Sequence, residues 1–200
     1  MLTDKENYLE AGVNIGSRQH VQDMERFVFQ VKKNNLAIID LDETDERIGN
    51  AANLLSNYDP EDILVVSRKE IGHRPVVKFA EATGAKRIFD RFMPGTLTNP
   101  NSDDFMEPEI VVVTDPAEDD TAVMETVDAN IPVVAIADTA NSLEYIDYAI
   151  PGNNKAKGSV ALIYYLLARE YLKERGEIED DSDFGYDMDD FEAEEVEDNE

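Results

Sequence analysis

The sequence predicts a three-layer α/β/α domain with a mainly parallel sheet, an N-terminal β-hairpin and an acidic C-terminal tail. The strongest indication is a β-α-β pattern in residues 108–157. Ile110–Val113 and Val133–Ala137 are short runs rich in β-branched residues, as in strands buried on both faces. Residues 117–129 lie between them and place apolar side chains along one helix face. A strand, a helix and a strand in this order predict a parallel pair with a right-handed crossover.

Residues 27–40 predict the hairpin. Apolar and polar side chains alternate in residues 27–31, and an apolar run at residues 37–40 forms the second strand. The asparagines between them, Asn34 and Asn35, can adopt the positive φ angles that a tight hairpin turn requires.

The other expected elements follow from apolar spacing and from helix-end signals. Asp42 is the expected N-cap of one helix, and Gly84 is a suitable residue just past the end of another. We expect a short extended segment at 12–16, helices at 43–57, 70–83 and 155–175, strands at 63–66 and 88–89, and a loop at 92–107.

The composition fits one domain over residues 1–176 and a tail over residues 177–200 in a chain of 200 residues. The tail has 14 acidic residues and no Lys or Arg, so we expect it to be disordered. The absence of cysteine excludes disulfides and thiolate catalysis, which fits a reducing cytoplasm. A polar start and the lack of an apolar run of ~20 residues predict a soluble intracellular protein with no membrane partner.

Several short motifs occur in a fixed order along the chain. They comprise Ala11-Gly12-Val13-Asn14-Ile15-Gly16, Pro94-Gly95-Thr96-Leu97-Thr98-Asn99, Pro108, Val111–Val113, Asp115, Asp119, Val123, Glu125, Asn130-Ile131-Pro132, Asp138-Thr139, Asn141, Asp147 and Ile150-Pro151-Gly152-Asn153-Asn154. With these motifs the chain resembles the universal small-subunit ribosomal protein family S-two, from about Tyr8 to Gly176. It is similar to the short archaeal form, because it has no room for the helical hairpin insertion of the bacterial form.

The resemblance implies a structural constituent of the small ribosomal subunit, in the cytoplasm, with a flavodoxin-like sheet. Members of the family lie at the head–body junction near the mRNA exit region and join late in subunit assembly. They contact small-subunit rRNA and neighbouring ribosomal proteins, and they support translation without catalysis. The resemblance therefore implies no enzyme activity, no cofactor, no metal and no small-molecule substrate.

The charge of the chain argues against RNA binding at ordinary salt. The net charge is −27, and residues 1–176 alone have 31 acidic against 18 basic residues, which should repel a polyphosphate. At about 1 M salt the Debye length falls to roughly 3 Å, so that only close contacts matter. We therefore infer a high-salt cytoplasm, resembling that of halophilic archaea; the alternative is an acidic protein that never meets RNA.

The candidate RNA-binding residues are basic or amide side chains near strand ends, helix starts and the hairpin tip. Arginine keeps bidentate phosphate contacts when a diffuse positive field is screened. Lys155 and Lys157 lie at a helix start, where a bound phosphate would explain cations that the helix dipole disfavours. The full set is Arg18, His20, Lys32, Lys33, Arg68, Lys69, Arg74, Lys78, Lys86, Arg87, Arg91, Asn153, Asn154, Lys155 and Lys157. For Arg18, His20, Lys32 and Lys33 the alternative is a solvated surface side chain, and for Lys155 and Lys157 it is chance placement.

Two other functions stay open. Asp40, Asp42, Asp115 and Asp138 at strand ends would fit a Mg²⁺ site of a receiver-like or phosphohydrolase-like domain, provided that the carboxylates converge. The acidic tail would instead fit a protein–protein adaptor. A nucleotide-binding loop is poorly supported, because the chain contains neither GxxxxGK[ST] nor GxGxxG.

Overall fold

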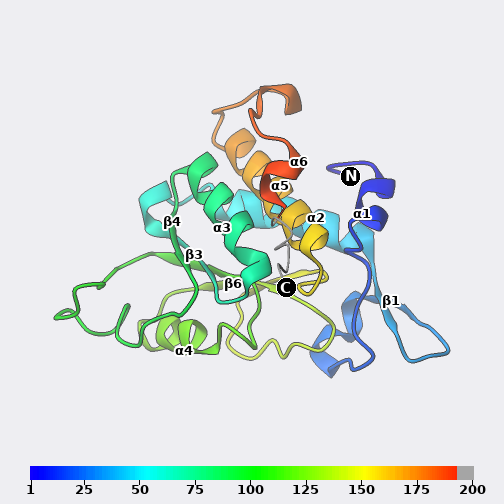
Figure 1. Ribbon diagram of the computed structural model, residues 1–200, viewed down its shortest axis with the longest axis horizontal. Helices are drawn as coiled ribbons and strands as arrows, with labels where there is room; N and C mark the ends of the chain where they lie inside the picture. Colours follow the sequence, from blue (N-terminus) through cyan, green and yellow to red (C-terminus); the bar gives the residue numbers. More distant parts are fainter. Residues whose placement is uncertain (193–200) are drawn as a thin grey trace, which may run out of the picture.

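The computed structural model describes residues 1–192, and its centre is a five-stranded sheet (Figure 1). The strands are β3 (Ile63–Ser67), β4 (Lys86–Phe89), β5 (Ile110–Val113), β6 (Val133–Ala137) and β7 (Tyr148–Pro151). Their order is β4-β3-β5-β6-β7, and every neighbouring pair is parallel. The expected parallel sheet and the central β-α-β unit are therefore confirmed.

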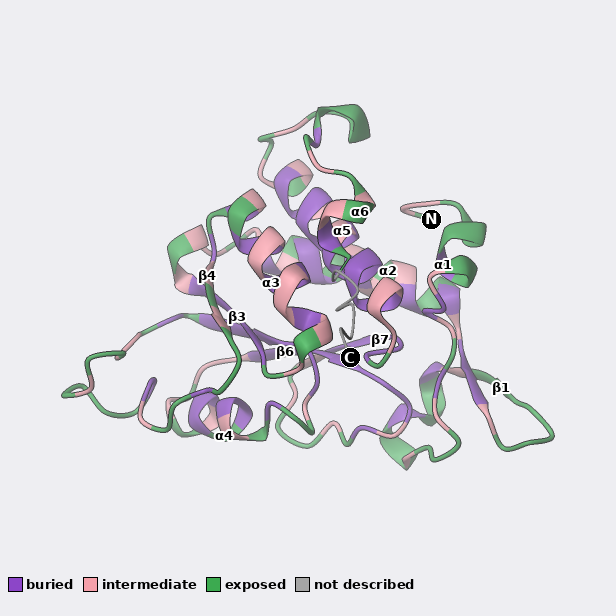
Figure 2. Ribbon diagram, viewed as in Figure 1, coloured by how far each residue is buried: buried purple, intermediate pink, exposed green. Residues whose placement is uncertain are grey.

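Helices cover both faces of this sheet. Figure 1 shows α2 (Leu41–Leu55), α3 (Glu70–Thr83) and α5 (Lys157–Glu174) on one face, and α4 (Asp120–Asp128) on the other. Side chains alternate between the two layers, because successive residues of a strand point to opposite faces. Ile63 and Val65 join the core under α2, α3 and α5, whereas Leu64 and Val66 join the core over α4. Figure 2 shows the strands β3, β5 and β6 and the inner helix faces as buried.

The chain reverses direction across the sheet at β3. From β3 it passes through α3 to β4 on one side, and it then returns to pair β5 on the other side of β3. The connections after β3 and β5 therefore leave the carboxyl edge on opposite faces. Such a reversal opens a crevice at the ends of the two strands.

The N-terminal hairpin is confirmed. It consists of β1 (Val28–Val31) and β2 (Ala37–Ile39), which pair antiparallel, and Asn35 in the turn has a φ of 63°. The first strand is largely exposed, and Phe29 retains 67% of its accessible surface. Figure 1 shows the hairpin projecting from the body at the end opposite β4.

Several boundaries differ from the sequence expectation. The helix expected from residue 43 begins at Leu41, because the Asp40 side chain accepts a hydrogen bond from the Asp42 backbone N–H at 3.0 Å. Asp40, and not Asp42, is therefore the N-cap. The short elements α1 (Lys5–Glu10), η1 (Gln22–Phe27) and η2 (Pro60–Asp62) and the strand β7 were not expected.

The expectation of disorder is wrong for the part of the acidic tail that ends at residue 192. It forms η3 (Asp181–Asp183) and α6 (Met188–Phe191). Phe184 and Phe191 are 6% and 0% exposed, and the Tyr165 ring of α5 lies 5.3 and 5.7 Å from their ring centres. Aromatic side chains thus attach an acidic segment to the domain. The expectation for residues 193–200 lies outside the described residues.

None of the helices described in residues 1–192 combines the length and apolar character that crossing a bilayer requires.

Candidate nucleic-acid interface

A polar network occupies the carboxyl edge of the sheet, where β3, β5, β6 and β7 end. The Lys69 ammonium donates to one oxygen of Asp115, and the Asn141 amide donates to the other at 2.9 Å. The Asn154 amide donates to the Asn141 side-chain oxygen at 2.9 Å and to the Ile136 carbonyl at 3.1 Å. The loops after these strands are therefore joined by buried side-chain hydrogen bonds, which make the edge rigid.

A second pair of charges closes the same edge near the N-terminal segment. Lys155 Nζ lies 2.6 Å from Asp138 Oδ2, and the Ser17 hydroxyl donates to the same oxygen at 2.5 Å. The other Asp138 oxygen accepts the Thr139 backbone N–H at 2.6 Å. Asp138 therefore holds residue 17 against the end of β6.

The carboxylates of the proposed Mg²⁺ site do not converge. Asp115 and Asp138 each face a different lysine and each cap their own turn, and Asp40 caps α2. The Asp42 side chain is 74% exposed, beside Lys5. Within residues 1–192 no group of three or more metal-ligating side chains is arranged to hold an ion. The geometry does not favour the receiver-like or phosphohydrolase-like alternative.

Asn153 and Asn154 are buried rather than presented to solvent. They are 7% and 0% exposed. The Asn153 amide donates to the Gly12 carbonyl at 3.0 Å, and its oxygen accepts the Lys155 backbone N–H. These two amides hold the chain together at the end of β7, so their side chains do not reach a surface ligand in this conformation.

Several of the predicted cations are engaged within the protein. Lys69 pairs with Asp115 and Lys155 with Asp138, and Lys78 pairs with Glu81 at 2.8 Å. The Arg74 guanidinium donates to the Asp190 carbonyl at 2.8 Å, beneath α6. Lys157 is half-buried at the start of α5 and also makes an interaction within the protein. An RNA contact by any of them would compete with these interactions.

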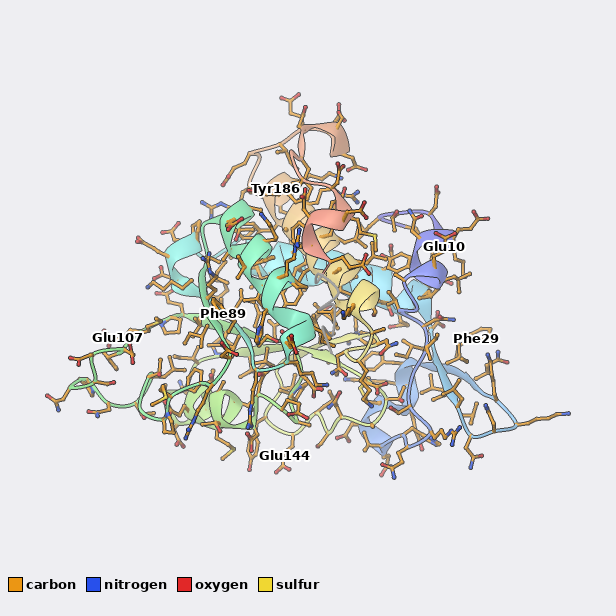
Figure 3. The ribbon with its side chains drawn as sticks, viewed as in Figure 1. Glu10, Phe29, Phe89, Glu107, Glu144 and Tyr186 are labelled. Atoms are coloured by element: carbon orange, nitrogen blue, oxygen red, sulfur yellow. The ribbon has the colours of Figure 1, made fainter. Side chains whose placement is uncertain are left out.

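The remaining predicted cations form two groups without internal ion pairs among the described residues. One group lies at the β4 end of the sheet and contains Arg68, Lys86, Arg87 and Arg91. The other lies on the N-terminal segment and the hairpin tip and contains Arg18, His20, Lys32 and Lys33, all of them exposed. Figure 3 labels one residue near each group, Phe89 on β4 and Phe29 on β1.

Asp119 is a structural residue whose role the sequence reasoning missed. Its two oxygens accept the Arg68 backbone N–H at 2.7 Å and the Asp115 backbone N–H at 3.0 Å, so it joins the loops after β3 and β5. Burial raises the pKa of the Asp119 carboxyl to about 6, although these hydrogen bonds lower it. Its position four residues after Asp115, at a helix start, was the available signal.

Glu125 plays a similar part for the long loop after β4. Its carboxylate accepts the backbone N–H groups of Gly95 at 2.5 Å and Leu97 at 3.1 Å. The Pro94–Asn99 motif therefore packs against α4, and Leu97 is 5% exposed.

Arg47 was also missed, because nothing in its sequence context distinguishes it from a solvated helix residue. Its guanidinium lies 4.6 Å from the Phe27 ring centre and 4.8 Å from that of Tyr148, and it donates to the Ala149 carbonyl at 2.8 Å. It thereby fastens α2 to the edge strand β7.

Comparison with known proteins agrees with the resemblance in the sequence. Residues 8–103 and 101–173 match the family model Ribosomal protein S2. Over 187 residues the chain is 45% identical to the small ribosomal subunit protein uS2 of Methanococcus maripaludis strain C6, covering 94% of this chain and 85% of that protein. It is 44% identical over 188 residues to the protein of the same name in strain C5, with 94% and 86% covered.

These matches define the class of the protein, which is structural and not enzymatic. The chain belongs to the ribosomal protein S2 family. In this chain several of the motif residues quoted above hold the carboxyl edge together. Asp115, Asp119, Asp138, Asn141 and Asn154 all bind backbone or side-chain groups there.

Proposed function

We propose that this protein is a structural component of the small ribosomal subunit that binds small-subunit rRNA and neighbouring ribosomal proteins at the head–body junction. It works in the cytoplasm, in translation and in the late assembly of the subunit. Family membership supports the ribosomal role. The arrangement of its cations supports the RNA contacts.

The observation that supports RNA binding most strongly is the set of cations left unpaired in a chain with 45 acidic and 18 basic residues. With so many carboxylates available, an exposed Arg or Lys has ample opportunity to form an ion pair. Arg68 and Arg91 at one end, and Arg18 and Lys32 at the other, form none among the described residues. Two separated positive groups on a rigid frame suit two positions on an RNA backbone, where phosphate contacts fix orientation.

The rigid frame itself fits this role. Numbered from the first parallel strand, the sheet order is 2-1-3-4-5, which is the order of flavodoxin-like sheets and supports that assignment. Asp119 holds the backbone of Arg68, and Asp138 holds Ser17, the residue before Arg18. Shape recognition of RNA requires such fixed positions.

We further propose that the protein works at high salt, as in halophilic archaea. A net charge of −27 would oppose RNA binding over a Debye length of roughly 10 Å at 0.1 M salt. At molar salt the repulsion is confined to direct contacts, and there the unpaired arginines meet phosphate while the acidic tail is held against α5.

The test is sedimentation with small subunits that have been depleted of this component. Tagged protein is mixed with them in molar KCl and Mg²⁺ and run through a gradient. The proposal predicts stoichiometric movement with the subunit at molar KCl and weaker association when the salt is lowered. Folded protein that stays at the top of the gradient at molar KCl would contradict the ribosomal role.

A further inference from the structure

A cavity of about 260 Å³ lies at the carboxyl edge, between the loop after β3, the segment after β4 and the start of α4. Residues from all three segments line it, among them Arg68, Arg91, Phe92, Glu118, Asp119 and Thr121. The cavity is at the place where the chain reverses direction across the sheet, because α3 leaves on one face and α4 on the other. Ligands of open α/β sheets bind at such switch points.

Asp119 holds the walls of this cavity in place. It bonds to the backbone of Arg68 on one wall and to the backbone of Asp115, just before α4, on the other. Both of its oxygens are thereby used, so it positions the site and does not face a ligand.

Three charged side chains in the cavity are left without partners. Arg68, Arg91 and Glu118 all line it, and yet none of them forms a side-chain ion pair with another or with any other described residue. Two guanidiniums, which are donors suited to phosphate, and one carboxylate acceptor therefore line the same cavity without neutralising each other. Phe92 and Ala122 supply apolar lining of the same cavity.

We propose that this cavity binds one guanine nucleotide. The phosphate lies against the Arg68 and Arg91 guanidiniums, and the base presents its Watson–Crick edge to Glu118. A bare anion has no hydrogen-bond donor for the carboxylate. Guanine offers two adjacent N–H groups that can both donate to one carboxylate. The volume lies just below the about 300–1,000 Å³ of pockets for drug-sized ligands, and the three charged residues are exposed, so part of a bound nucleotide would remain in solvent.

The inference rests on the proposed function, because an unpaired guanosine of rRNA, turned out of its stack, is the expected source. A free guanine nucleotide has the same recognition chemistry. The two sources differ in that the RNA nucleotide is flanked by phosphodiesters, whereas the free nucleotide has a terminal phosphate.

The test is an NMR titration of the full-length protein in molar KCl with GMP, AMP, guanosine and inorganic phosphate, which follows the Thr121 and Ala122 amides. We expect saturable shifts with GMP at millimolar concentration and weaker binding of the other three. Arg91→Gln should weaken GMP binding about 10-fold or more, as expected for a lost charged hydrogen bond. Glu118→Gln should abolish the preference for GMP over AMP and leave AMP binding unchanged.

The matched control is Arg87→Gln. It removes the same charge four residues earlier, on the edge strand β4 itself, but Arg87 pairs in register with Val65 and therefore faces the opposite side of the sheet from the cavity. Equal losses of GMP binding in R87Q and R91Q would show a general charge effect and overturn the proposal. Equal binding of GMP and AMP to the wild-type protein, or no saturable shift at the cavity, would also overturn it.

Two further measurements are needed. One distinguishes an RNA nucleotide from a free nucleotide, and the other distinguishes failure of the cavity assignment from failure of the proposed ribosomal role. Tighter binding of an oligouridine with one central guanosine than of GMP supports the RNA source, and the reverse supports a free nucleotide. If no guanine nucleotide binds while the protein still sediments with depleted small subunits, the cavity assignment fails and the ribosomal role stands. If the protein also fails to sediment, both are contradicted.

Discussion

Asp119 shows how a single buried carboxylate organises the carboxyl edge. It is 3% exposed and bonds to the backbone after β3 and after β5. Its chemistry is structural, although its position at a strand end and helix start would equally suit a ligand-binding acid. The sequence could predict that an acid stood here, but not that its oxygens would be taken by backbone N–H groups, because these come from residues up to 51 positions away.

The raised pKa of Asp119 predicts a pH dependence of stability. Burial raises it from 3.8 to about 6, so between about pH 4 and pH 6 the folded protein binds more protons than the unfolded chain. The free energy of unfolding therefore falls as the pH rises through this window, by up to roughly 3 kcal/mol from this group. Asp119→Asn should lack this contribution. Urea unfolding of both proteins should be measured near pH 4 and near pH 7. The free energy of unfolding of the variant should rise relative to that of the wild type between the two.

The exposed neighbour Asp120 provides the control for this measurement. Asp120→Asn makes the same charge change outside the buried site, and it should leave the pH dependence as in the wild type. A parallel pH dependence of Asp119→Asn and the wild type would show that Asp119 titrates normally.

Gly72 is a position where only a hydrogen fits. A Cβ there would lie 2.2 Å from the Ser67 hydroxyl oxygen and 2.9 Å from the Ser67 Cβ, so α3 could not start so close to β3. Gly72→Ala should therefore destabilise the protein by about 1–3 kcal/mol. Gly49 in α2 has open space around it, and Gly49→Ala should stabilise by about 0.5–1 kcal/mol. Thermal unfolding would test whether the two substitutions change the stability in opposite directions. Stabilisation by both would disprove the close approach of α3 to β3 at Gly72.

At the scale of elements, a helix or strand could be predicted where its apolar sequence pattern was strong. The strands β3, β5 and β6 are buried runs rich in β-branched residues, and the helices that follow β3 and β5 were recognisable from their apolar spacing. The strand β7 reads YAIP, which mixes small, aromatic and proline residues, so its pairing with β6 depends on tertiary contacts. The six-residue helix α1 is too short to give a periodic signal.

The tail was misjudged for a related reason. Its apolar residues are few and separated by acids, which is the composition of a disordered segment. Composition does not reveal that Phe184 and Phe191 meet Tyr165 of α5, or that Asp181 lies 3.4 Å from Arg169. A few aromatic contacts and ion pairs are enough to hold the tail, because the folded domain provides one partner of each contact.

Phe191→Ala tests the attachment of α6. The side chain is fully buried, so its loss should cost about 3 kcal/mol and expose the Arg74 side chain that α6 covers. Limited proteolysis should then cut near residue 186, where the wild type resists. The control is Phe29→Ala on the hairpin, because Phe29 is 67% exposed and its removal should change stability little. Equal stability of the Phe191→Ala variant and the wild type would mean that α6 does not hold the tail.

At the scale of the whole molecule, the positions of the cations explain how a chain with an acidic net charge would bind RNA. The chain has 45 acidic against 18 basic residues, but two groups of cations without ion pairs among the described residues lie beside β4 and on the N-terminal segment and hairpin, which Figure 1 shows on opposite sides of the molecule. The sequence indicated basic clusters after β3 and around β4. It could not separate Lys69, Arg74 and Lys155, which bind within the protein, from Arg68 and Arg91, because that distinction depends on partners distant in sequence.

The most direct measurement compares two variants of equal charge for association with depleted small subunits in molar KCl. The first replaces the unpaired residues Arg18, Lys32, Arg68 and Arg91 with Gln, and the second replaces the paired residues Lys5, Lys78, Lys173 and Arg175 with Gln. Circular dichroism establishes that both are folded. We predict that the first loses association by about 10-fold or more while the second sediments like the wild type. Equal association of the two variants would contradict the claim that the unpaired cations bind the rRNA.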